Sequence, residues 1–174
     1  LNAVVVFVDN SFSMQNQGRQ GRLLDEAKQN AKEITEQYNS NDLFLLLTMD
    51  LEGRHQQFVN KDKFIELLNQ VEISPSSEFN SKLISRSFDL LNTKHGFNKR
   101  IFFVSDFQAP SFDVSNFPKD SLIRTLLVPL NANNIDNIYV DSISFVDPIF
   151  QVGQNIALNV RIVNKSEKKA EKVS

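Results

Sequence analysis

The chain has 174 residues, of which 41% are hydrophobic and 23% are charged, and its formal net charge is −2. This length and composition are those of a globular protein with one compact domain and room for part of a second. The lack of excess positive charge argues against nucleic-acid binding, and the absence of cysteine excludes disulfides, thiolate metal sites and a cysteine nucleophile.

The first elements are a strand, a helix and a second strand. Residues 3–8 form a continuous apolar run, typical of a strand covered on both faces in a parallel sheet. Apolar residues then recur at helical spacing among Lys and Glu, which predicts an amphipathic helix over 22–38. The stretch LFLLLTM at 43–49 predicts a second buried strand.

Two helices and two further buried strands follow. Asn60 stands where it can cap the first of these helices, and a loop containing Pro75 precedes the second. The stretches 100–106 and 122–130 are again almost continuously apolar and predict the third and fourth strands. Buried strands that alternate with helices predict an α/β fold with a doubly wound, mostly parallel sheet.

The pattern changes after residue 131. Residues 138–146 and 155–164 alternate between apolar and polar side chains, as antiparallel strands with one solvated face do. We therefore predict an α/β domain over 1–131, whose sheet is truncated or completed differently. Residues 135–174 are expected to be the start of a β-sandwich-like module, a partial antiparallel unit that the end of the chain cuts short.

Two of the predicted strands end in a carboxylate, Asp9 after the first and Asp106 after the third. Ligands of an open α/β sheet bind outside the carboxyl ends of its strands, so these carboxylates face one crevice if the two strands are neighbours. Ser11 and Ser13 can present hydroxyls to the same place. Such hard oxygen donors suit Mg²⁺, Mn²⁺ or Ca²⁺. The alternative is that Asp9 and Ser13 only cap the helix that follows.

The stretch DNSFS at 9–13, placed after a buried strand, resembles the D-x-S-x-S signature of von Willebrand factor type A domains. The resemblance covers about residues 2–130. More narrowly, VVVFVDNSFSM with SDFQ at 105–108, followed by a β-module, is similar to the membrane-anchored bacterial Bat (aerotolerance-type) proteins.

This resemblance implies a metal-ion-dependent adhesion site that holds a divalent cation, most simply Mg²⁺, with Mn²⁺ or Ca²⁺ as alternatives. The implied ligands, direct or through water, are Asp9, Ser11, Ser13 and Asp106.

Two departures from the family pattern concern the loops around this site. The third loop usually supplies a Thr, whereas this chain has Ser76, Ser77 and Glu78 there, and Ser77 or Glu78 is a candidate further ligand. Phe107 stands where the family has a glycine after its last Asp, which makes that loop bulkier. Phe107 and Gln108 are candidate residues for binding a partner.

No enzyme template fits the chain. Aspartate-dependent phosphatases need a second carboxylate where Ser11 stands, and no histidine follows His95 to serve as the general base of a serine hydrolase. The predicted function is therefore non-enzymatic: a protein-interaction domain whose bound cation engages a carboxylate of a partner. The alternative is a metal-independent scaffold or assembly domain with a degenerate site.

The resemblance also implies a cellular setting. It predicts a bacterial protein anchored in the cell inner membrane through segments outside this sequence, with the domain on the periplasmic side. The expected partners are other proteins, among them components of a membrane complex, and no nucleic acid.

Overall fold

The computed structural model of the protein describes six stretches of the chain, namely 1–50, 57–75, 81–108, 120–133, 138–145 and 157–164. The chain divides into two units, Leu1–Asn133 and Asn134–Ser174, and each is described by itself.

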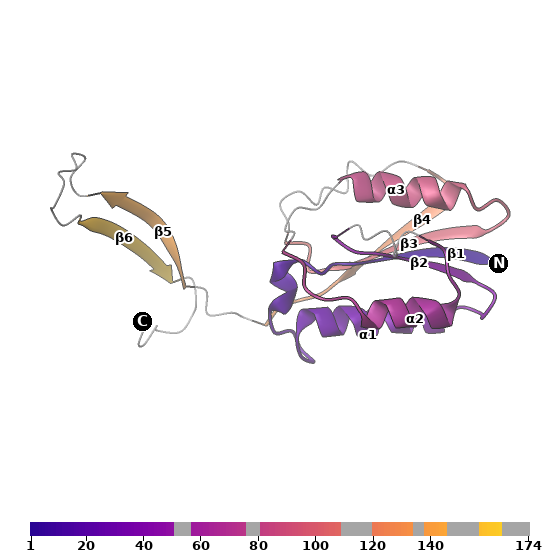
Figure 1. The fold of residues 1–174 in the computed structure, drawn as a ribbon, viewed down its shortest axis with the longest axis horizontal. Helices are drawn as coiled ribbons and strands as arrows, with labels where there is room; N and C mark the ends of the chain where they lie inside the picture. The colour runs from indigo at the N-terminus through magenta and orange to yellow at the C-terminus, as the bar shows by residue number, and fades with distance from the viewer. Residues whose placement is uncertain (51–56, 76–80, 109–119, 134–137, 146–156, 165–174) are drawn as a thin grey trace. The chain divides into compact units, whose positions relative to one another are not determined.

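The first unit is built on a four-stranded sheet with the strand order β2-β1-β3-β4 (Figure 1). Its strands are β1 (Asn2–Val8), β2 (Leu43–Leu47), β3 (Asn98–Ser105) and β4 (Ile123–Pro129). Every pair of neighbouring strands is parallel, which confirms the predicted sheet. Parallel neighbours need a crossover connection, and helices lie in the connections from β1 to β2 and from β2 to β3.

Helices cover both faces of this sheet (Figure 1). The helices α1 (Leu23–Glu36) and α2 (Lys61–Asn69) lie on one face, and α3 (Ser81–Asn92) lies on the other. The predicted cap of α2 is confirmed, because the Asn60 side chain accepts a hydrogen bond of 2.9 Å from the backbone N–H of Lys63. Within the described stretches, no helix has both the length and the apolar character that crossing a membrane requires.

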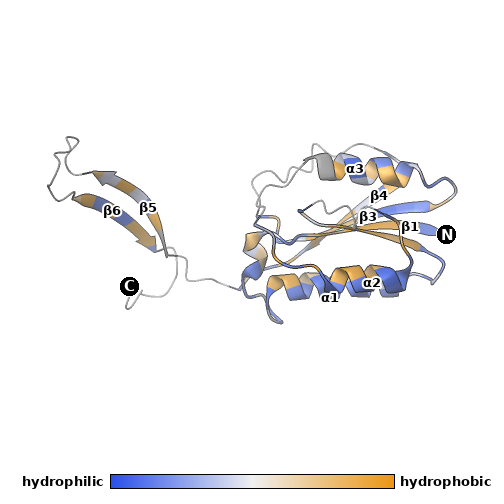
Figure 2. Cartoon of the chain, in the orientation of Figure 1, coloured by the Kyte–Doolittle hydropathy of each residue, from blue (hydrophilic) through white to orange (hydrophobic). Residues whose placement is uncertain are grey.

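Strand β1 lies inside the sheet and is covered on both faces, which explains its apolar sequence over residues 3–8. Successive side chains of a strand point to opposite faces, so alternate residues join different hydrophobic clusters. Val4 and Val6 pack in the cluster on the α1 and α2 face, whereas Val5 and Phe7 pack in the cluster on the α3 face. β2 is accordingly apolar along its length and β1 is apolar after Asn2, while the helices carry both hydrophobic and hydrophilic residues (Figure 2).

The second unit holds an antiparallel strand pair, β5 (Ile138–Phe145) and β6 (Leu158–Asn164). Its register shifts between Val140 and Ser142. Because of this bulge, Val140 and Ile143, which are three residues apart, face partners on β6 that are only two residues apart.

One face of this strand pair is therefore largely apolar. Its large hydrophobic side chains are between 49% and 63% exposed, and they are Val140, Ile143, Phe145, Leu158, Val160 and Ile162. Each of them lies opposite another member of the group across the two strands. Apolar and polar side chains of these antiparallel strands thus lie on opposite faces, as their alternation in the sequence predicted.

Candidate functional site

The candidate site lies where β1 and β3 end. The two strands are neighbours, with Val8 opposite Val104, and the backbone N–H of Asp9 donates a 2.9 Å hydrogen bond to the carbonyl of Val104. Asp9 and Asp106 are the first residues after these two strands. The condition on which the predicted crevice depended, that the two strands are adjacent, is met.

The Asp9 carboxylate is 4% exposed and is held by two hydrogen bonds. Its Oδ1 accepts from the backbone N–H of Ser11 at 2.9 Å, and its Oδ2 accepts from the hydroxyl of Ser105 at 2.5 Å. Both partners lie close to the strand ends, whereas α1 begins only at Leu23. Asp9 therefore fixes the loop after β1 rather than capping α1.

The hydroxyls of Ser11 and Ser13 lie together. Their Oγ atoms are 3.1 Å apart, and a hydroxyl of one donates to the other. Ser11 is buried and Ser13 is half-buried, at the start of the short 3-10 helix η1 (Phe12–Gln15). The Ser11 hydroxyl does not cap that helix, although Ser11 is its N-cap residue. Two hydroxyl oxygens thus converge in the loop that also carries Asp9.

The Asp106 carboxylate has one satisfied and one unsatisfied oxygen. Its Oδ1 accepts a 3.2 Å hydrogen bond from the backbone N–H of Gln108. Its Oδ2 is buried and has no hydrogen-bond partner within the described part of the chain. A buried carboxylate oxygen without a donor is costly, so it is a natural ligand for a cation.

The available donors fit a hard divalent cation. Two carboxylates and two hydroxyls provide the oxygen ligands that Mg²⁺, Mn²⁺ and Ca²⁺ prefer. Across the described stretches, no group of three or more His, Asp or Glu side chains could hold a metal. A cation at the ends of β1 and β3 would therefore depend on Ser11 and Ser13 as well as on the two Asp residues.

The loop after Asp106 keeps a backbone conformation that glycine favours. Phe107 has φ of +52°, in the left-handed region. Its N–H donates to the hydroxyl of Ser105 at 2.9 Å, and its half-buried side chain packs against the hydrophobic cluster on the α3 face. Gln108 is exposed. The other candidate ligands, Ser77 and Glu78, lie outside the described residues.

Asn10 is a site residue that the sequence pattern did not single out. It is 1% exposed, and its Oδ1 accepts a hydrogen bond of 2.9 Å from the backbone N–H of Met49. Its Nδ2 donates to Oδ2 of Asp50 at 2.7 Å and to the carbonyl of Glu72 at 2.8 Å. The backbone N–H of Ser74 donates a hydrogen bond of 2.7 Å to the backbone carbonyl of Asn10.

Asn10 therefore ties the loop after β1 to the end of β2 and to the segment after α2. The only sequence signal was a primary amide placed directly between Asp9 and Ser11. A single sequence cannot tell that such an amide is buried, because its partners come from distant parts of the chain.

Comparison with known proteins supports the fold. No family model and no curated protein matches the chain. Several solved structures match it, among them two that each have 12% sequence identity. An aerotolerance-related membrane protein from Bacteroides fragilis aligns with a TM-score of 0.56 over 92% of this chain and 82% of its own. The protein BatB from Bacteroides thetaiotaomicron aligns with a TM-score of 0.54 over 94% and 80%.

The chain shares the fold of these two proteins, and in this chain a parallel sheet with helices on both faces is followed by an antiparallel strand pair. The resemblance predicted from the sequence is confirmed at the level of the fold.

Proposed function

We propose that this protein is a non-enzymatic protein-interaction domain that holds a divalent cation at the ends of β1 and β3 and engages a carboxylate of a partner protein. The observation that carries the proposal is the buried Oδ2 of Asp106, which lacks a partner among the described residues. The adjacent residue, Ser105, donates a hydrogen bond from its hydroxyl to Asp9. The loops that carry Asp9 and Asp106 are therefore connected to each other.

The site residues would have different roles in binding the cation. Ser11 and Ser13 would supply hydroxyl ligands, and Asp106 would supply its free oxygen. Asp9 would act through its fixed orientation, because both of its oxygens already accept hydrogen bonds. The cation, when bound, supplies an open coordination position that accepts a carboxylate from outside.

The cellular setting is part of the proposal. A solved structure with the same fold is described as an aerotolerance-related membrane protein. This description supports a setting at a membrane. Within that setting we propose a bacterial protein anchored in the inner membrane by segments outside this sequence, with the domain on the periplasmic side and with proteins of a membrane complex as partners. The net charge of −2 favours protein partners over nucleic acid.

Calorimetric titration tests the metal site. Mg²⁺ and Mn²⁺ are titrated into the wild type, Asp106→Asn and Ser13→Ala, with Asp42→Asn as the control. Asp42 lies directly before β2, at the opposite end of the sheet. We expect one cation per wild-type chain and at least about tenfold weaker binding in the two site variants. If Asp106→Asn binds both metals as the wild type does, the proposed site is wrong.

A second candidate function is that of a metal-independent scaffold. It is favoured by the two hydrogen bonds to Asp9, which satisfy one oxygen each without a cation. A scaffold of this kind would keep its protein partner in excess chelator. The metal-dependent domain would release it.

A further inference from the structure

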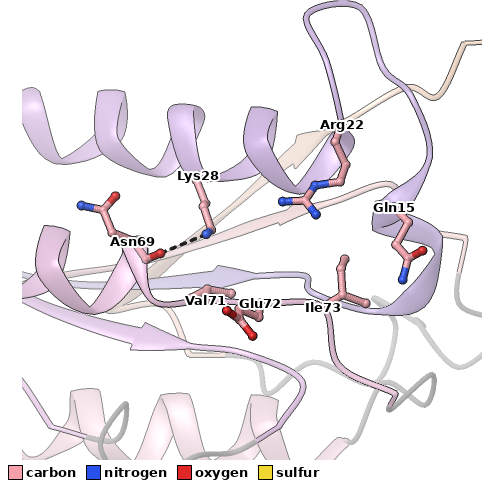
Figure 3. A pocket seen from close by; sticks show the side chains of 7 residues that line it. All are labelled: Gln15, Arg22, Lys28, Asn69, Val71, Glu72 and Ile73. Carbon is pink, nitrogen blue, oxygen red and sulfur yellow. Dashed lines mark hydrogen bonds between the residues drawn. The ribbon is translucent and has the colours of Figure 1, made fainter.

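A pocket of about 520 Å³ lies between α1, the end of α2 and the segment that follows it (Figure 3). Arg22 and Lys28 bring two cations to it, and the exposed Glu72 brings one carboxylate. This volume lies within the range of known ligand-binding sites and exceeds the volume of a single side chain. Two cationic groups and one carboxylate are thus the charged groups that line the pocket.

Lys28 is the central cation of this pocket. Its Nζ donates to the carbonyl of Asn69 at 3.2 Å, the one hydrogen bond it makes among the described residues. An ammonium group has three donors, so two remain for a ligand. Burial lowers the pKa of Lys28, and Arg22 adds to that effect, while Asp25 and Glu72 oppose it. An incoming anion would relieve this electrostatic cost.

Arg22 adds a second donor group at the mouth of the pocket. Its Nε and Nη2 donate to the carboxylate of Asp25 at 3.2 and 3.0 Å, which orients the guanidinium plane. Its Nη1 is not used in that pairing. Both side chains point into the space between α1 and the segment 71–73 (Figure 3). Arg22 and Lys28 can therefore both offer donors to an anionic group that enters this space.

Apolar side chains complete the pocket. Val71 is buried and Ile73 is half-buried, and both line it. A ligand that suits this lining carries a carboxylate beside an apolar group. Acidic peptide segments with aliphatic neighbours have that chemistry.

The pocket borders the candidate metal site. Gln15, which lines it, ends the 3-10 helix that begins directly after Ser11. Asn10 donates to the carbonyl of Glu72 and accepts from the N–H of Ser74, so the segment that lines the pocket is bound to the site loop. A protein that engages the site can therefore reach the pocket with a neighbouring part of its chain.

We propose that this pocket binds an acidic side chain of an extended peptide segment of the partner, with Lys28 and Arg22 holding the carboxylate and the half-buried Ile73 contacting the aliphatic residue beside it. The proposal rests on the proposed function in one respect, namely that the partner is a protein. It does not require the cation.

Nuclear magnetic resonance titration of the full chain tests this inference. The probe is acetyl-Leu-Glu-Leu-amide, with acetyl-Leu-Gln-Leu-amide as the uncharged control, and all titrations are made in EDTA. The variants are Lys28→Gln and Arg22→Gln. The matched control is Lys32→Gln, because Lys32 lies one turn further along α1, is exposed and does not line the pocket.

We expect saturable shifts of amides that line the pocket, those of residues 15, 22, 28 and 69–73, with the Glu peptide. Binding should be about fivefold weaker in Lys28→Gln and Arg22→Gln and unchanged in Lys32→Gln, as expected for one partly exposed charge pair. Absence of a saturable shift would overturn the inference. Equal binding of the Gln peptide, or an equal loss in Lys32→Gln, would overturn it as well.

The metal titration separates this result from the proposed function. If the peptide binds in EDTA while no cation binds in calorimetry, the pocket stands and the metal site fails. If a cation binds but the peptide does not, the metal site stands and the pocket assignment is wrong.

Discussion

The hydroxyl of Ser105 donates a hydrogen bond to Oδ2 of Asp9, and so joins two residues that are 96 positions apart in the chain. Both residues are buried, and the same hydroxyl oxygen accepts from the backbone N–H of Phe107. Ser105 therefore links the end of β1 to the loop that carries Asp106. The relative placement of the Asp9 and Asp106 loops therefore depends in part on this side chain.

Replacing Ser105 with Ala should affect both stability and metal binding. The buried Asp9 oxygen and the Phe107 N–H each lose their partner, so the free energy of unfolding should fall by about 1–3 kcal/mol. The affinity for Mg²⁺ should fall about tenfold, as is typical when a residue that orients a ligand is lost. Urea denaturation and calorimetry measure the two effects. Asp42→Asn is the control, because it should lower stability and leave metal affinity unchanged.

Replacing Asn10 with Asp should strongly destabilise the first unit. The change keeps the acceptor for Met49 but removes the donors to Asp50 and Glu72, and it places a buried charge beside the Asp50 carboxylate. We expect a loss of about 3 kcal/mol or more in urea denaturation.

The matched control is Asn60→Asp at the start of α2. Asp is as good an N-cap as Asn, so its effect should stay within about 0.5 kcal/mol. Equal effects of the two Asn→Asp changes would contradict the buried role of Asn10.

The stability of the protein should depend on Asp42 at acidic pH. Burial works to raise the pKa of Asp42, but hydrogen bonds from Asn2 and Asn39 outweigh it, and the pKa lies below its ordinary value of 3.8. Its contribution is therefore complete above the ordinary value and is lost as the pH falls toward the folded-state pKa. The stability gap between the wild type and Asp42→Asn should shrink as the pH falls from 6 to about 3. A gap that is constant over this range would contradict the assignment.

Because the backbone at Phe107 is left-handed, replacing Phe107 with Ile or with Leu, two residues of equal size, should affect stability differently. Ile is β-branched and fits φ of +52° poorly, whereas Leu does not have this branch. Phe107→Ile should therefore be less stable than Phe107→Leu by at least about 1 kcal/mol. The same pair of changes at Phe103, within β3, should show a small or reversed difference because strands favour Ile. Thermal or urea denaturation of the four variants decides the matter.

Amides of β5 and β6 should exchange with solvent faster than those of β1. A two-stranded pair with an exposed apolar face is only marginally stable in water. In a dilute sample we expect hydrogen exchange at least about 100-fold faster than in β1. Equal protection of the two strand sets would show that the apolar face is covered in solution. Protection that rises with protein concentration would assign the cover to a second copy of the chain.

The sequence by itself determined the fold class. Each sheet strand is an apolar run short enough for a strand, and alternation with amphipathic helices leaves few arrangements other than a parallel sheet with helices on both faces. The predictions from the sequence were wrong about where some strands begin and end. The predicted strand over 43–49 ends at Leu47, and the predicted strand over 100–106 begins at Asn98 and ends at Ser105. Asn98 and Lys99 are polar and were excluded by the apolar pattern, but their backbones pair with β1.

The tertiary structure decided what the site residues do. The spacing of Asp9, Ser11 and Ser13 was visible in the sequence, but the hydrogen bond from Ser105 and the role of Asn10 were not. Both depend on strand order, because the Ser105 bond needs β3 beside β1 and the Asn10 bonds to Met49 and Asp50 need β2 beside β1. A side chain shows its type in the sequence, whereas its partners are set by which distant segments the folded sheet brings beside it.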